Sequence, residues 1–270
     1  MSYLEAIVLA LVQGLTEFLP ISSSGHLILV PRFLGWEDQG LAFDIAVHLG
    51  TLLAVCFYFR DEIQNILKAW TASFRSDGPA YFEGEAKFGW SIVLATIPVC
   101  VVGFFWHDFI QENLRSPILI AATTLIFGIA LWLVDRRGGA GEDEHIMRFR
   151  WALLIGVAQA IALIPGTSRS GITITAALLL GLSRPAAARF SFLMSIPVIA
   201  LASLNEIKEL IEVKEAVQWD MMIIGTLVSA VSAYLCIRFF LKMLNRITML
   251  PFAIYRVILA AVIYFSFAGL

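Results

Sequence analysis

Residues 13–26 read Gln13-Gly-Leu-Thr-Glu17-Phe-Leu-Pro-Ile-Ser22-Ser23-Ser24-Gly25-His26, and this polar phrase decides how the chain folds. A related phrase at 159–171 reads Gln159-Ala-Ile-Ala-Leu-Ile-Pro-Gly166-Thr-Ser168-Arg169-Ser170-Gly171. In each copy a Gln stands 12 positions before a Gly, and the copies are 146 positions apart. Polar side chains are costly in a bilayer, so their duplication within apolar sequence indicates a site.

The composition is that of an integral membrane protein. Of 270 residues, 59% are hydrophobic and only 15% are charged, whereas a soluble domain has roughly 25% charged residues. The net charge of −2 says little, because the bilayer sets the partners of such a chain, and no nucleic-acid partner is expected. The three cysteines have no paired spacing, which disfavours a disulfide framework or a cysteine metal site.

Six apolar stretches have the length of about 20 residues that a helix needs to cross a bilayer. They are 41–59, 90–106, 117–134, 186–204, 220–238 and 250–268. The segments beside the two phrases are shorter, at 3–15, 27–36, 151–164 and 172–182. Segments of this length, separated by Pro, Ser and Gly, favour re-entrant hairpins that line a cavity.

The order of these segments predicts an all-α integral membrane protein with an inverted-topology repeat. Each half has one re-entrant helix hairpin and three transmembrane helices, and three crossings turn the second half upside down. The single membrane domain, 1–270, then consists of a first repeat at 1–137 and a second at 148–270, joined by a cytoplasmic loop. The similarity extends beyond the phrases, since 43–50 lies 147 positions before 190–197.

Lysine and arginine counts predict the orientation, because cytoplasmic loops carry an excess of both. One side receives Arg32, Arg115, Lys208 and Lys214. The other side receives Arg60, Lys68, Arg75, Lys87, Arg136, Arg137, Arg148, Arg150, Arg184, Arg189, Arg238, Lys242 and Arg246, and is therefore cytoplasmic. The first hairpin then opens outward and the second enters from the cytoplasm.

Both serine-rich runs precede short helices, so they are expected to cap helix N-termini, which bind anions through free N–H groups and the helix dipole. Arg169 adds a forked donor that matches phosphate oxygens. The alternative is that the serines only cap helices and that the Arg169 side chain extends to the membrane surface.

Glu17 lies four residues after Gln13, so both share a helix face. Glu17 is a candidate to bind a divalent cation, orient water or fix a histidine, and the alternative is a structural pair with Arg169. His26 lies three residues after Ser23, which leaves two options for the nucleophile: Ser23 with His26 as base, or His26 itself.

Three further polar groups fall outside the phrases. Arg256 lies within an apolar span and needs a partner there, either structural or a lipid head group. Asp44 and His48 share a helix face and favour a structural role. The acidic run at 142–144 is expected to be solvated.

With these motifs the chain resembles the bacterial undecaprenyl-diphosphate phosphatase family, the bacitracin-resistance proteins. The matching segments are Gln13-x-x-x-Glu17, Ser22-Ser23-Ser24-Gly25-His26 and Pro165-Gly166-Thr167-Ser168-Arg169-Ser170-Gly171-Ile172-Thr173, and the stretch ending at Arg256 matches as well. The resemblance implies hydrolysis of a C55 polyprenyl diphosphate at the bacterial cytoplasmic membrane, with the site open to the outer side. It also implies Mg²⁺ or Ca²⁺ dependence.

The expected roles divide into three groups. The catalytic residues are Glu17, Ser23, His26 and Arg169; the substrate-binding residues are Ser22, Ser24, Gly25, Gly166, Ser168, Ser170, Thr173 and Arg256; the metal ligands are Glu17 and Gln13. Many family members have Glu at the position of Gln13, so a two-carboxylate metal site is in doubt here. A homodimer is one option for the oligomeric state.

Two other functions are alternatives to hydrolysis by this family. The acid-phosphatase-like lipid phosphatases need a His and then an Asp after their Ser-Arg motif, but the four histidines here are 26, 48, 107 and 145, all before Arg169. A polyprenyl-phosphate flippase or transporter would use the same anion site and stays as the alternative.

Overall fold

The computed structural model describes residues 1–74, 83–114, 116–137, 141–213 and 218–267, whose regular elements are helices. They are α1 (Tyr3–Thr16), α2 (Ser23–Leu34), α3 (Gly40–Tyr58), α4 (Arg60–Ala72), α5 (Glu83–Asn113), α6 (Pro117–Asp135), η2 (Glu144–Ile146), α7 (Phe149–Ile161), α8 (Arg169–Leu179), α9 (Arg184–Val213), α10 (Trp219–Met243) and α11 (Leu250–Phe267). The all-α fold class is thereby confirmed.

Six of these helices are long and apolar enough to cross a membrane, and each overlaps one of the six predicted spans. They comprise Gly40–Tyr58, Gly84–Trp106, Pro117–Asp135, Arg184–Lys208, Trp219–Met243 and Leu250–Phe267. Their exposed side chains are largely apolar, as a lipid-facing surface requires. The chain is a multi-pass membrane protein.

The two polar phrases fold into matching helix–turn–helix units, α1–α2 and α7–α8. The residue that precedes each second helix has a positive φ, 73° at Ser22 and 68° at Ser168, and these serines are 146 positions apart. A positive φ is uncommon for a residue other than glycine. α2 begins at Ser23, four residues before the predicted start at 27, so Ser23 to His26 form its first turn.

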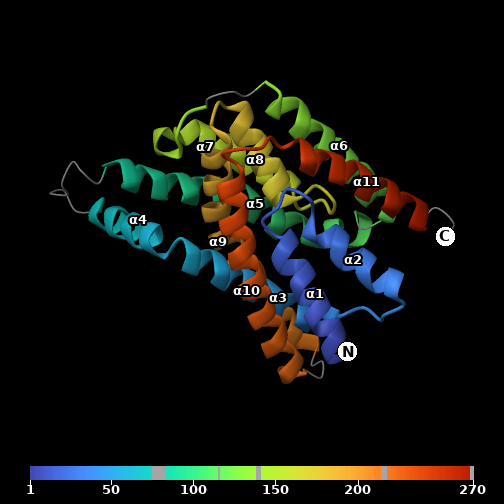
Figure 1. Cartoon of the computed structure of the whole chain (residues 1–270). Coiled ribbons are helices and arrows are strands. Elements are labelled where there is room, and N and C mark those ends of the chain that lie inside the picture. The colour runs from blue at the N-terminus through green and yellow to red at the C-terminus, as the bar shows by residue number, and fades with distance from the viewer. Residues whose placement is uncertain (75–82, 115, 138–140, 214–217, 268–270) are drawn as a thin grey trace.

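Each unit packs on a long helix from the other half of the chain. α1 lies along α10, and α7 lies along α5 (Figure 1). At Gly14 an added Cβ would be 2.0 Å from Ser232 Oγ of α10, and at Gly156 it would be 2.4 Å from the Ala95 carbonyl of α5. These close approaches bring the turns of the two units together, where Ser170 Oγ donates to the Leu19 carbonyl at 2.8 Å.

Ion pairs join several helices that are distant in the sequence. Arg189 of α9 pairs with Glu62 of α4 and Glu144 of η2, and Arg184 pairs with Asp135 at 2.5 Å. Glu144 is buried, so the expectation that the acidic run is solvated is wrong for this residue. Burial of a carboxylate is tolerable here because it is paired.

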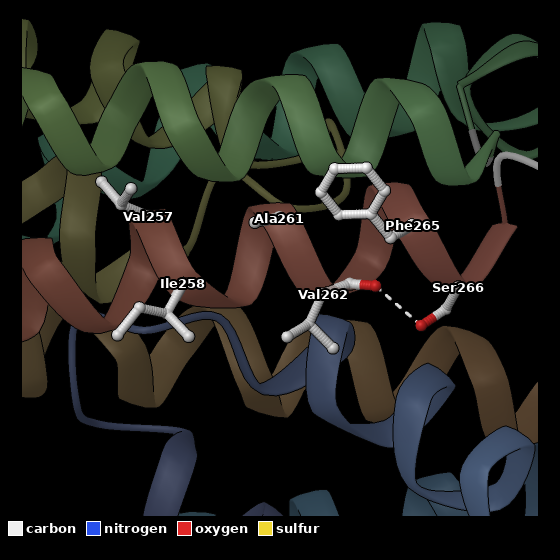
Figure 2. A pocket seen from close by; sticks show the side chains of 6 residues that line it. All are labelled: Val257, Ile258, Ala261, Val262, Phe265 and Ser266. Carbon is white, nitrogen blue, oxygen red and sulfur yellow. Dashed lines mark hydrogen bonds between the residues drawn. The ribbon is translucent and has the colours of Figure 1, made fainter.

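A hollow larger than the cavity at the polar turns lies along α11. It has a volume of about 540 Å³ and is lined almost entirely by apolar side chains of α11. Figure 2 shows these side chains along the helix, with Ser266 Oγ donating to the Val262 carbonyl.

The predicted loop residues Arg75, Arg115 and Lys214 lie outside the described residues.

Candidate active site

A polar cavity of about 160 Å³ lies where the turns of the two units meet. Its lining consists of Glu17, Ser22, Ser23, Ser24, His48, Ala162, Gly166, Ser168 and Arg169. All of these residues except His48 come from the two phrases. Sequences almost 150 residues apart therefore form one site, as their duplication predicts.

Glu17 is the centre of the hydrogen-bond network. It follows the last residue of α1, and its Oε1 accepts from Arg169 Nη2 at 2.8 Å. Its Oε2 accepts from Ser23 Oγ at 2.7 Å and from Gln13 Nε2 at 2.9 Å. The carboxylate and the guanidinium are 8% and 14% exposed, so water screens this pair only weakly.

The two helix N-termini at the cavity differ in how they are capped. At α8 the Ser168 hydroxyl accepts from the Gly171 N–H at 3.2 Å. At α2 the Ser22 side chain makes no capping hydrogen bond and instead lies 3.2 Å from Ser24 Oγ. Because an uncapped N-terminus keeps N–H groups available for an anion, α2 is the better anion-binding end.

His26 does not contact the Ser23 hydroxyl and does not line the cavity. Its Nδ1 is 2.7 Å from the Ser22 carbonyl, which can only accept, so Nδ1 carries the proton. Its Nε2 therefore accepts from the Tyr255 hydroxyl at 2.5 Å. Both ring nitrogens are engaged, so in this arrangement Glu17 rather than His26 accepts the hydrogen bond from Ser23.

Arg256 is fully buried and is not one of the residues that line the cavity, and its role in substrate binding stays a prediction. Its guanidinium donates to the carbonyls of Thr124 at 3.0 Å, Gly166 at 3.0 Å and Thr167 at 2.9 Å. A longer bond of 3.5 Å reaches the carbonyl of Pro20. Arg256 thus joins both phrases and α6 through backbone carbonyls.

Three other expected phosphate ligands also face away from the cavity. Thr173 Oγ1 lies 2.7 Å from Ser191 Oγ of α9, and Ser170 donates to the Leu19 carbonyl. Gly25 faces α11, where an added Cβ would make only ordinary contacts. Each helix presents only some of its side chains to the cavity, because successive residues point in different directions around the helix axis. These three residues lie on the faces that pack against other parts of the protein.

Gly166 does line the cavity, and the structure requires glycine there. Its φ is +85°, and an added Cβ would be 2.3 Å from Thr123 Oγ1 and 2.4 Å from the Ile120 carbonyl. The backbone carbonyl of Gly166 also accepts from Thr124 Oγ1 at 3.2 Å. Gly166 therefore holds the second turn against α6.

The donor set does not fit a resident divalent cation on Glu17 and Gln13. Both oxygens of Glu17 already accept hydrogen bonds, and its charge is balanced by Arg169. Gln13 is buried beside Glu17 rather than in the cavity lining. Across the described ranges, no group of three His, Cys, Asp or Glu side chains is placed to hold a metal ion.

Sequence reasoning missed two residues of this region. His48 of α3 lines the cavity, although its spacing from Asp44 favoured a structural role. Tyr255 lies beside the motif arginine and contacts His26, with the two ring planes within 8° of each other. The one sequence signal for Tyr255 was its position next to Arg256 in an otherwise apolar span.

The fold and the site define a multi-pass membrane protein whose buried cavity, lined by serines and an arginine at helix N-termini, suits an anion. A family profile described as bacitracin resistance protein BacA matches residues 6–262, and the chain belongs to this family. The resemblance found from the motifs is confirmed.

Relatives of known name extend over the whole chain. It is 54% identical to undecaprenyl-diphosphatase 2 of Stutzerimonas stutzeri, with 100% of both chains covered. It is 53% identical to undecaprenyl-diphosphatase of Thioalkalivibrio sulfidiphilus, over 99% of this chain and 100% of that one. Identity to undecaprenyl-diphosphatase of Chromohalobacter salexigens is 55%, over 97% and 98% of the two chains.

Proposed function

We propose that this protein hydrolyses undecaprenyl diphosphate to undecaprenyl phosphate and inorganic phosphate, which recycles the lipid carrier of cell-wall synthesis. The names of the relatives and of the family support this substrate. The observation that carries the proposal is the chain of contacts from Ser23 to Glu17 to Arg169 in a cavity at the N-terminus of α2.

Substrate binding uses the positive features of the cavity. The terminal phosphate receives hydrogen bonds from the uncapped N-terminus of α2, from the hydroxyls of Ser22, Ser24 and Ser168, and from the guanidinium of Arg169. Helix N-termini carry about half a positive charge, and arginine binds phosphate through parallel donors. Arg169 is fixed in direction by Glu17, so little ordering of its side chain is needed when substrate binds.

Ser23 is the nucleophile of this proposal. Its hydroxyl proton passes to Glu17 Oε2 while Oγ attacks the terminal phosphorus, and the bond from that phosphorus to the bridging oxygen breaks. Undecaprenyl phosphate leaves, and the phosphoryl group remains on Ser23. Arg169 and the helix N-terminus stabilise the charge that spreads over the phosphoryl oxygens in the transition state.

The test measures phosphate release by the purified full chain in lipid nanodiscs. We expect Ser23→Ala and Glu17→Gln each to lower the rate by about 10²-fold or more, since general base catalysis alone contributes about 10²–10⁴-fold. Ser73→Ala is the matched control, because Ser73 is exposed at the end of α4 and donates to its own helix. Unchanged rates in Ser23→Ala would contradict the assigned nucleophile.

The apolar tail of the substrate has a matching surface on α11. The groove in Figure 2 begins at Val257, two residues after Tyr255, whose hydroxyl contacts His26 near the polar turns. We expect a tail lying in this groove to protect it: a spin label at Ile258 should become less mobile when polyprenyl diphosphate is added. Unchanged mobility would place the tail elsewhere.

The divalent cation implied by the family resemblance is proposed to arrive with the substrate. Glu17 is already paired with Arg169, so it is a poor ligand for a cation held by the protein alone. We therefore favour a cation that binds the diphosphate in solution and enters the site with it. Mg²⁺ is often bound through substrate phosphates together with only one or two carboxylates.

Transport of polyprenyl phosphate is the second candidate function, since inverted repeats are typical of transporters. The hydrogen bond from Ser23 to Glu17 favours hydrolysis, because a carrier needs cations and dipoles but no nucleophile. A transport role would leave movement of polyprenyl phosphate across vesicles intact in Ser23→Ala, whereas a hydrolase loses its only activity in that variant.

We further propose the inverted repeat and a location in the bacterial cytoplasmic membrane with the site open to the outer side. The matching φ angles of Ser22 and Ser168 and the exchanged packing of α1 and α7 support the repeat. The excess of arginines at one end supports the orientation. In a cysteine-free background, Arg32→Cys should react with an impermeant maleimide in intact cells and Arg137→Cys should not; the reverse would contradict the orientation. The homodimer remains a prediction.

A further inference from the structure

His48 is the one residue of the polar cavity that neither phrase supplies, and its geometry leaves one ring nitrogen available. Its Nδ1 lies 2.7 Å from the Asp44 carbonyl of its own helix. A carbonyl only accepts, so Nδ1 carries the proton, and in the neutral imidazole Nε2 presents a lone pair. The charged groups that line cavities with His48 are Glu17, Arg169 and, from α9, Glu206.

A second cavity of about 170 Å³ begins at the pair of Glu17 and Arg169. It shares both of these residues and His48 with the first cavity, and continues between α5, α7 and α9. Apart from the residues already named, its walls are largely apolar, with Val99, Val198 and Ile199 among them. A diphosphate has little to bind along such walls.

Two buried polar groups line this second cavity with unused hydrogen-bonding capacity. Gln159 is 0% exposed and Ser203 is 2% exposed. Within the described part of the chain, neither Gln159 Oε1 nor Ser203 Oγ makes a hydrogen bond. Buried polar groups of this kind are normally satisfied by protein or by ordered water, and the volume suffices for several waters at about 30 Å³ each.

We propose that the second cavity supplies the hydrolytic water and that His48 is the base that activates it. This inference rests on the proposed phosphoryl transfer to Ser23 and assigns the second half of that reaction. The water oxygen forms a bond to phosphorus and one water proton passes to His48 Nε2. The bond from phosphorus to Ser23 Oγ breaks, and Oγ takes back the proton that Glu17 holds. Inorganic phosphate then leaves with the proton from His48.

The two steps need two bases because Glu17 is already protonated when water attacks. It accepted the Ser23 proton in the first step and returns it as the serine leaves, so it cannot also accept a proton from water. His48 lines both cavities, so it borders the second cavity as well as the phosphoryl site. Each step therefore has its own base: Glu17 accepts the proton of Ser23, and His48 accepts the proton of the water.

The experiment follows a label on the terminal phosphate of polyprenyl diphosphate with the full chain in nanodiscs. In His48→Gln we expect a rapid burst of about one polyprenyl phosphate per chain, label retained on the protein, and steady release of phosphate about 10²-fold slower than in the wild type. The burst itself shows that the variant is folded and binds substrate. In His48→Ala, added imidazole should restore phosphate release.

Other results would overturn the inference. Wild-type release of phosphate by His48→Gln shows that another group activates water. Loss of the burst together with failure of imidazole rescue places His48 in folding or in the first step. Undiminished phosphate release by Ser23→Ala would instead contradict the proposed nucleophile. This result differs from those expected of the His48 variants, so the two proposals can fail independently.

Discussion

Replacing Arg256 by Met separates a structural role from a role in phosphate binding. Arg256 is fully buried and makes three hydrogen bonds of 2.9–3.0 Å to backbone carbonyls of the second phrase and α6. Methionine fills much of the same space but removes all three hydrogen bonds, and the Thr167 carbonyl then loses the donor that Arg256 supplies. The substitution therefore tests the hydrogen bonds more than the packing.

The expected loss of stability follows from these bonds. A hydrogen bond to a charged group contributes roughly 1.5–3 kcal/mol, so three such bonds set an upper range of about 4.5–9 kcal/mol. Removal of a buried charge also relieves its desolvation cost, which places the expected change at the low end, about 4.5 kcal/mol. For a chain of this size each 1 kcal/mol shifts Tm by about 2–4 °C, so Tm should fall by roughly 10 °C.

Thermal unfolding in nanodiscs, followed by tryptophan fluorescence, measures this shift. Arg60→Met is the control, because Arg60 is 52% exposed and its ion pair with Asp61 is on the surface. The control should change stability by no more than about 0.5 kcal/mol. An Arg256→Met protein with an unchanged Tm and a much weaker affinity for polyprenyl diphosphate would refute the reasoning, since Arg256 would then be a substrate ligand.

Three further predictions concern the turn, the histidine and the cation. Gly166→Ala should lower Tm much more than Gly35→Ala, because both have positive φ but only the first Cβ meets neighbours, at 2.3 Å from Thr123 Oγ1; equal shifts would show that backbone strain alone matters. Tyr255→Phe should reduce phosphate release by less than tenfold, since it removes one hydrogen bond of about 1 kcal/mol from His26, and a loss beyond 10²-fold would give the tyrosine a direct role. Equilibrium dialysis with Mg²⁺ should show no saturable binding to the chain until a diphosphate is added, and stoichiometric binding without it would contradict the cation proposal.

The helical spans were accessible from the sequence because span length is a local property. An apolar run of about 20 residues must satisfy its backbone hydrogen bonds within one helix, whatever its neighbours do. The same local argument identified the broken segments at Ser22 and Ser168. It did not place the start of α2, since serines and glycine are poor helix formers and suggested a start after His26.

The acidic run shows where a local argument fails. A Gly-rich, charged segment is normally solvated, and Glu144 was assigned on that basis. The helices α4 and α9, distant in sequence, bring Glu62 and Arg189 to it. A paired carboxylate can be buried, so the partner decides its environment.

By itself, the sequence determined that this is a membrane protein with two polar turns, each before a short helix. Hydrophobicity and helix capping depend on residues close together in the chain, which is why both features could be predicted. Tertiary structure alone decided which side chains share the cavity. Packing of α1 on α10 and of α7 on α5 sets the rotation of each short helix, and rotation about a helix axis decides which residues face the site. In the folded chain His48 lines the cavity, while His26 contacts Tyr255 and Arg256 binds backbone carbonyls.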